Sequence, residues 1–155
     1  MRLRIIALGH RMPAWVSEAV AEYAKRLPRE FAFELVEIKA APRDRGRSVP
    51  QLLAEEAQRV SASSEGTRII ALDERGAAWT TRKLAERLDR WQQEGASVAF
   101  VIGSADGLDP ELKRSAESVV AVSAMTLPHG LVRVVLAEQL YRAASLNAGH
   151  PYHRE

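Results

Sequence analysis

Apolar residues fall into short runs and longer stretches with helical spacing, and the two patterns alternate along the chain. The short runs predict strands at residues 3–8, 31–38, 68–73, 97–103 and 119–123. Stretches with helical spacing of apolar residues predict helices at residues 15–27, 49–62 and 131–147. A further helix, capped by Thr80 or Thr81, is predicted to run to about residue 94. Asp109 and Pro110 mark a shorter helix start.

Alternating strands and helices are typical of a mostly parallel sheet with helices on both faces. The sequence therefore predicts one α/β domain over residues 1–155, a length that can bury a sizeable core. Ligands of such sheets bind beyond the carboxyl ends of the strands. Those ends are expected at Gly9, Asp73, Gly103 and Ser123.

Composition narrows the function classes. Hydrophobic residues make up 46% of the chain and charged residues 27%, which is typical of a globular protein and not of a disordered one. The net charge of +2 predicts weak bulk attraction to nucleic acid. With no cysteine, disulfides, thiolate metal sites and a cysteine nucleophile are excluded. No apolar run suits a secretory signal or a membrane span, so we expect a cytoplasmic protein.

Two loops in the last third carry the candidate chemistry. Gly103–Gly107 follows a strand, but it matches neither the dinucleotide fingerprint nor a phosphate-binding loop, and a tight turn is the simpler interpretation. Residues 123–130 form a longer bend that exposes backbone groups able to bind an adenine. His129 begins the following helix, where it either acts in the site or only caps and packs.

The last helix is apolar on every side except at Arg133, Glu138 and Arg142. Because the sheet can cover only one face, the pattern predicts a homodimer built largely on this helix. Glu138 and Arg142 are four residues apart, a spacing that favours an ion pair.

Two further stretches suit RNA contacts. Three arginines (43, 45 and 47) surround Gly46 in a loop that either grips phosphates or is simply solvated. In the tail HPYHRE, Tyr152 suits base stacking, Arg154 a phosphate and His153 proton transfer.

The segments FVIGSADGLDP, SAMTLPHGLVRVVLAEQLYRA and HPYHRE closely resemble the bacterial ribosomal RNA large subunit methyltransferase H family, a SPOUT-class group. The resemblance runs the length of the chain, through IIALG and RIIALDERG. The family methylates N3 of a pseudouridine in 23S rRNA. It usually has two glycines where this chain has Gly103 and Ser104, and serine is small enough to leave the backbone path open.

The resemblance implies a C-terminal trefoil knot, a homodimer whose tails complete the partner's site, and a substrate presented by the assembled ribosome. It also implies S-adenosylmethionine as cofactor. The residues expected to bind it are Leu72, Gly103, Ser104, Ser123, Ala124, Met125, Thr126, Leu127 and Pro128.

Methyl transfer to an imide nitrogen needs donor and acceptor held in line and a proton removed. His153 or His129 is expected to assist the proton loss, and Tyr152, Arg154 and Arg133 to orient the nucleotide. The histidines lack carboxylates at ligand spacing, so no metal site is expected. Two other functions compete: a non-catalytic ribosome-associated RNA-binding module, and a nucleotide-binding dehydrogenase domain, which the missing fingerprint disfavours.

Overall fold

The computed structural model describes residues 1–9, 11–44 and 46–153. Its strands are β1 (Leu3–Leu8), β2 (Glu34–Ile38), β3 (Arg68–Ala78), β4 (Val98–Ile102) and β5 (Ser118–Ala121). Its α-helices are α1 (Ala14–Ala24), α2 (Val49–Ser63), α3 (Thr81–Gln93), α4 (Pro110–Ser115) and α5 (His129–Asn147). The predicted alternation of strands and helices is confirmed.

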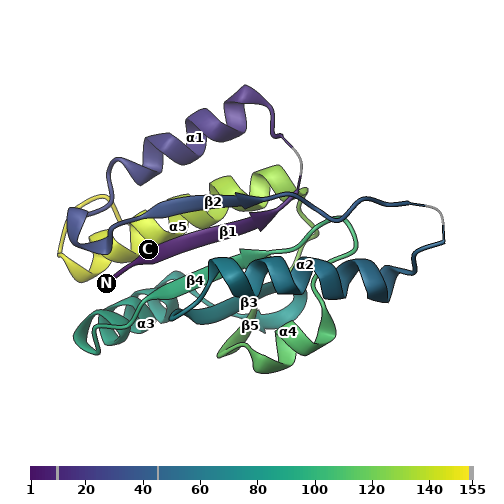
Figure 1. Cartoon of the computed structure of the whole chain (residues 1–155). Helices are drawn as coiled ribbons and strands as arrows, with labels where there is room; N and C mark the ends of the chain where they lie inside the picture. The colour runs from purple at the N-terminus through teal and green to yellow at the C-terminus, as the bar shows by residue number, and fades with distance from the viewer. Residues whose placement is uncertain (10, 45, 154–155) are drawn as a thin grey trace.

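The five strands form one parallel sheet in the order β2-β1-β4-β3-β5. Because all strands run the same way, their carboxyl ends meet at one edge, and the helices that follow them begin there (Figure 1). The predicted α/β class with a parallel sheet is confirmed. The trefoil knot stays a prediction.

Helices cover both faces of the sheet, as expected. One buried cluster joins α1, α3 and α5 to strand residues such as Ile5 and Phe100. The other joins α2 and α4 to residues such as Ile6 and Val101 (Figure 1). Neighbouring residues on a strand therefore pack against helices on opposite faces of the sheet. Because both faces are buried, β1 and β4 are continuous apolar runs in the sequence.

Two strand boundaries differ from the prediction. Phe31 does not begin β2: it closes a short 3₁₀ helix, Arg29–Phe31, and Ala32 then takes a left-handed conformation with φ 41°. Phe31 is buried in the core, so its apolar character reflected packing and not a strand.

The strand β3 is longer than predicted: it runs on to Ala78, five residues beyond the predicted end at residue 73. Its pairing with β5 shifts register between Leu72 and Ala77, then resumes with Ala77 opposite Val120. A side chain at Gly76 would place its Cβ only 2.6 Å from the backbone nitrogen of Val120, so this crossing requires glycine. The bulge at residues 73–76 pushes polar side chains to the edge where the strands end.

The helix α5 packs between α1 and α3. It begins at His129, two residues earlier than predicted, directly after Pro128. Between Leu131 and Leu146 every residue is at least half-buried, so neighbours in the same chain already cover much of the helix. A second copy of the chain against the remaining half-buried face stays a prediction.

Candidate functional site

A pocket of about 660 Å³ opens at the carboxyl edge of β3, β4 and β5. Its walls come from the start of the β3 bulge, the loop 103–108 after β4, and the loop 122–127 after β5. His129 and Val132 close it from α5. The position agrees with the rule that ligands of parallel sheets bind beyond the strand ends.

The structure brings most of the predicted cofactor residues to this pocket. Those that line it are Leu72, Gly103, Ser104, Ser123, Met125, Thr126 and Leu127. Ala124 and Pro128 belong to the same loop but do not line the pocket, and both are exposed. Two loops that are separate in sequence therefore share one cavity.

The first loop is a tight reversal held by its own backbone. Gly107 donates its backbone N–H to the carbonyl of Ser104 over 2.9 Å. A Cβ on Gly103 would lie 2.5 Å from the carbonyl oxygen of Gly107, and Gly107 itself has φ +84°. The loop needs glycine at both positions, at the first for space and at the second for conformation.

The second loop is fixed by short polar contacts. The hydroxyl of Ser123 accepts a hydrogen bond from the backbone N–H of Met125 over 3.0 Å. The Thr126 hydroxyl donates to the carboxylate of Glu74 over 3.1 Å, which ties this loop to the β3 bulge. Met125 itself points outward with 78% of its surface exposed.

His129 joins the two loops. Its Nδ1 lies 2.9 Å from the carbonyl oxygen of Gly103, and its Nε2 accepts a hydrogen bond from Nε of Arg133 over 2.9 Å. A guanidinium can only donate, so Nε2 carries the lone pair and Nδ1 carries the proton that it donates to Gly103. Burial, and then the charge of Arg133, lower the pKa of His129 despite the bond to Gly103. The imidazole is therefore neutral at pH 7, with both nitrogens engaged.

Arg133 does not line the pocket, although sequence analysis expected it to orient the nucleotide. It is 1% exposed, and its Nη1 donates to the carboxylate of Glu37 over 2.8 Å. Its Nη2 is buried and has no hydrogen-bond partner among the described residues. In this chain Arg133 touches His129 and Glu37, so its contact with the pocket runs through His129.

Acidic side chains form part of the wall: the sequence placed Asp73 at a strand end near the expected site but gave none of these carboxylates a role. Asp73 accepts hydrogen bonds from the backbone N–H of Arg75 over 2.8 Å and from Nζ of Lys113 over 3.0 Å. Burial raises the pKa of Asp73, but these two bonds outweigh it and leave the pKa below its ordinary value. Glu74 and Asp106 add two more carboxylates to the lining.

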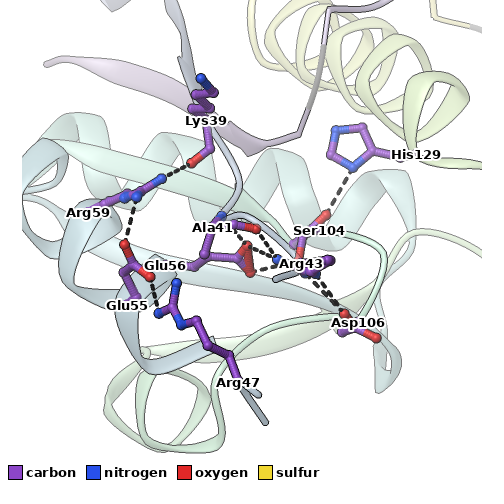
Figure 2. A network of polar contacts seen from close by, with 11 residues as sticks. Lys39, Ala41, Arg43, Arg47, Glu55, Glu56, Arg59, Ser104, Asp106 and His129 are labelled. Carbon is purple, nitrogen blue, oxygen red and sulfur yellow. Dashed lines mark hydrogen bonds and ion pairs between the residues drawn. The ribbon is translucent and has the colours of Figure 1, made fainter. Parts of the chain in front are cut away.

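The arginine loop is engaged in contacts within the chain. Arg43 forms ion pairs with Glu56 and Asp106, and Arg47 pairs with Glu55 (Figure 2). Neither side chain is free to grip a phosphate without giving up these partners. The third arginine, Arg45, lies outside the described residues.

Within the described part of the tail, Tyr152 packs on α5 of its own chain and does not line the pocket. The Tyr152 hydroxyl donates to Glu138 over 3.1 Å, and its ring lies 4.5 Å from that of Tyr141. Burial, and then Glu138, raise the pKa of Tyr152. Glu138 is nine residues after His129, or roughly 14 Å along the helix. Glu138 also pairs with Arg142 over 2.6 Å, as predicted.

His150 and His153, the tail histidines, are not among the residues that line the pocket either. Nδ1 of His153 is buried without a hydrogen-bond partner in the described chain. Arg154 lies outside the described residues. Among the residues that the structure describes, no group of three His, Asp or Glu is placed to hold a metal ion, and no helix is long and apolar enough to cross a membrane.

Comparison with known proteins identifies the family of the chain. The family model described as "Predicted SPOUT methyltransferase" matches residues 1–153. The ribosomal RNA large subunit methyltransferase H of Burkholderia multivorans is 57% identical over 155 residues, covering 99% of both chains. The protein of the same name from Burkholderia vietnamiensis is 56% identical over the same span.

Solved structures show the same fold at low sequence identity. A probable methyltransferase from Bordetella pertussis has a TM-score of 0.60 and 19% identity, over 92% of this chain and 95% of that one. A probable methylase family protein from Haemophilus influenzae has a TM-score of 0.61 and 12% identity, over 99% of this chain and 70% of that one.

Proposed function

Because the chain belongs to the SPOUT methyltransferase family, we propose that it transfers a methyl group from S-adenosylmethionine to N3 of a pseudouridine in the 23S rRNA of the assembled ribosome. The single observation that carries this proposal is the pocket that both loops line, where seven of the expected donor-binding residues meet. Its full-length relatives from Burkholderia carry the name of a ribosomal RNA large subunit methyltransferase, which supports rRNA as the substrate.

The pocket suits the donor in size and in chemistry. A volume of about 660 Å³ lies within the usual range for sites that hold small molecules and cofactors. Leu72, Ile102 and Leu127 offer apolar surface for a nucleoside, while the exposed loop backbone offers donors and acceptors for an adenine. Three carboxylates (Asp73, Glu74 and Asp106) and two cations (Arg75 and Lys113) line the pocket, so the lining keeps a small excess of negative charge that suits a sulfonium with an amino group.

When bound, the donor supplies an electrophilic methyl group on sulfur. The task of the chain is to hold that methyl in line with the acceptor nitrogen and to help the imide lose its proton. His129 is proposed as a positioning residue, because both of its nitrogens are occupied by Gly103 and Arg133. That leaves His153 as the proposed proton acceptor, with Tyr152 and Arg154 orienting the nucleotide.

A tail that rests on its own α5 must reach a pocket elsewhere to perform these roles. Tyr152 contacts Glu138 and Tyr141, which lie more than two helical turns from His129. The proposal therefore includes a homodimer in which the tail of one subunit completes the pocket of the other. The half-buried face of α5 is the surface proposed to bring the two subunits together.

The substrate is proposed to approach the same edge of the sheet. Among the described residues, the large hydrophobic side chains with high exposure are Trp15, Val49 and Met125. Trp15 and Val49 stand at the starts of α1 and α2, and Met125 follows β5, so all three belong to the edge that holds the pocket. Val16, next to Trp15, packs against Gly130 at the start of α5. An exposed tryptophan suits stacking on an unpaired base of rRNA.

A non-catalytic RNA-binding module is the alternative from another class. Titration calorimetry with S-adenosylmethionine and, separately, with NAD distinguishes these functions. The proposal predicts binding of the methyl donor and none of NAD. Binding of neither cofactor would favour the RNA-binding module, and binding of NAD alone would favour the dehydrogenase interpretation.

A further inference from the structure

A buried carboxylate lies beneath the first loop of the pocket. Glu56 is 1% exposed and shares the buried face of α2 with Leu52, Leu53 and Val60. A buried charge is costly unless partners neutralise it and satisfy its oxygens. Glu56 is not required by the proposed reaction, so its burial calls for another explanation.

Three groups satisfy the Glu56 carboxylate. Its Oε2 accepts from the backbone N–H of Ala41 over 3.1 Å and from Nη1 of Arg43 over 3.0 Å. Its Oε1 accepts from the hydroxyl of Ser104 over 2.7 Å. Arg43 also donates from Nη2 to the Ser104 oxygen over 2.8 Å. Because a guanidinium only donates, the single proton of the Ser104 hydroxyl is directed to Glu56.

Arg43 extends the contact to a second residue of the loop. Its Nε donates to Asp106 over 3.1 Å, and its Nη1 donates to the carbonyl of Ala41 over 2.7 Å. Figure 2 shows the guanidinium lying between α2 and the loop that carries Ser104 and Asp106. Both of these loop residues line the pocket, so the buried pair is coupled directly to the pocket wall.

The loop is thus held from both layers of the protein. From the α5 side, His129 donates to the carbonyl of Gly103. From the α2 side, Glu56 and Arg43 hold the adjacent Ser104. We propose that Glu56 is a positioning residue for the methyl donor, acting through Ser104 to keep the loop 103–107 in its binding conformation. This proposal rests on the proposed function. It adds that Glu56, through the loop 103–107, sets the affinity for the methyl donor.

The placement predicts which kinetic parameter changes. Glu56 contacts the loop that lines the donor pocket, and its hydrogen bonds to described residues go to Ala41, Arg43 and Ser104, not to Tyr152, His153 or Trp15, which are proposed to contact the nucleotide. Loosening the loop should weaken donor binding while leaving the turnover at saturating donor nearly unchanged. A merely structural role would instead lower the stability of the fold without this separation.

The first variant is Glu56→Gln. It keeps the size of the side chain but removes the negative charge that pairs with Arg43, and an amide nitrogen facing Ser104 turns that hydroxyl from a donor into an acceptor. We expect the dissociation constant for S-adenosylmethionine, measured by calorimetry, to rise roughly tenfold, as expected for a lost hydrogen bond to a charged group. The KM for the donor should rise in parallel, with kcat on ribosomes within about twofold of wild type.

The matched control is Glu55→Gln. Glu55 precedes Glu56 on the same helix and pairs with Arg47 and Arg59, with no hydrogen bond to the loop 103–107 among its contacts. The same chemical change there should leave donor affinity within about twofold of wild type. An equal loss in both variants would contradict a specific role for Glu56.

Ser104→Ala gives a second test that leaves the buried pair in place. It removes the hydroxyl while Glu56 keeps Arg43 and Ala41, so it carries the test even if Glu56→Gln fails to fold. Donor affinity should fall several-fold. In the double variant with Glu56→Gln, the loss of binding free energy should be smaller than the sum of the losses in the two single variants. Additive losses, or affinities equal to wild type, would overturn the proposal. A wild-type chain that binds no donor would refute the proposed function before any variant is compared, and this proposal with it.

Discussion

Nε of Arg133 donates a hydrogen bond to Nε2 of His129, one turn earlier on α5, over 2.9 Å. The bond fixes the tautomer of the imidazole, and the opposite nitrogen then reaches the carbonyl of Gly103 in the first loop. A fully buried cation therefore stabilises a neutral histidine at the pocket wall. Several consequences of this arrangement are open to measurement.

The first concerns pH. Burial and Arg133 lower the pKa of His129 in the folded chain, whereas the unfolded chain has the ordinary imidazole value of about 6.5. Below that value the unfolded state binds more protons, so stability from this residue is present above about pH 6.5 and is lost as the pH falls.

The variant His129→Gln cannot titrate, so it should lose less stability than wild type on acidification. Urea unfolding at about pH 7.5 and pH 5 measures the difference for both proteins. Equal losses in the two proteins would show that His129 is not held neutral by the fold.

The second prediction concerns Arg133 itself. Arg133→Met fills much of the same volume but removes the charge and the donors to His129 and Glu37. Because the positive charge lowers the pKa of His129, the pKa should rise in this variant, as measured by NMR titration of the imidazole. The free energy of unfolding should fall by about 1–3 kcal/mol, the range for lost hydrogen bonds to charged groups.

Glu37→Gln is the control for this change. It keeps the bond between Arg133 and His129, and the Glu37 side chain is 55% exposed, so stability should change by less than about 1 kcal/mol. A His129 pKa that stays the same in Arg133→Met would contradict the assigned interaction.

The third prediction concerns Gly103. In Gly103→Ala the new Cβ would lie 2.5 Å from the carbonyl oxygen of Gly107, so the loop must move. Overpacking of this kind should cost about 1–3 kcal/mol of stability and weaken donor binding at least about tenfold.

Gly95→Ala separates backbone strain from the pocket. Gly95 has φ +65° and no heavy atom within 4 Å of an added Cβ, and it lies at the end of α3. The variant should lose about 1–2 kcal/mol of stability and bind the donor as wild type does. Donor affinity that falls equally in both variants would show that stability alone governs binding.

The fourth prediction concerns Trp15, which is 53% exposed at the start of α1. If it stacks on an rRNA base, Trp15→Ala should raise the KM for ribosomes roughly tenfold, since stacking contributes about 1–3 kcal/mol per base. Donor affinity should not change, and Trp15→Phe should recover most of the loss. An unchanged KM for ribosomes in Trp15→Ala would remove Trp15 from the substrate surface.

Much of the fold follows from the apolar pattern alone. Continuous apolar runs predicted β1, β3 and β4 because both faces of these strands are buried. The same pattern gave the wrong start for β2, since Phe31 is apolar for packing and not for strand pairing. The extension of β3 through Gly76 depends on its register against β5, which no local pattern encodes.

The parts of the site that lie in loops directly after strands could be predicted from the sequence. The contacts between α2 and the pocket loop could not, because they join segments far apart in the chain. The loops 103–107 and 123–130 stood out by their turn chemistry, and the family resemblance pointed to the donor-binding residues within them, whereas nothing singled out Glu56. Its spacing from Leu52 and Val60 does place it on the apolar face of that helix, and a carboxylate at such a position is a detectable signal. Its partner Ser104 is 48 residues away, and only the folded sheet brings them together.

The proposed activity depends on methyl transfer to one nitrogen of one rRNA nucleotide. The most direct measurement incubates the protein with S-adenosylmethionine carrying a deuterated methyl group and ribosomes, followed by mass spectrometry of digested 23S rRNA. The account predicts one labelled methyl on N3 of a pseudouridine, formed on assembled ribosomes and not on stripped rRNA. Ribosomes that gain no label, or a label on another base, would contradict it.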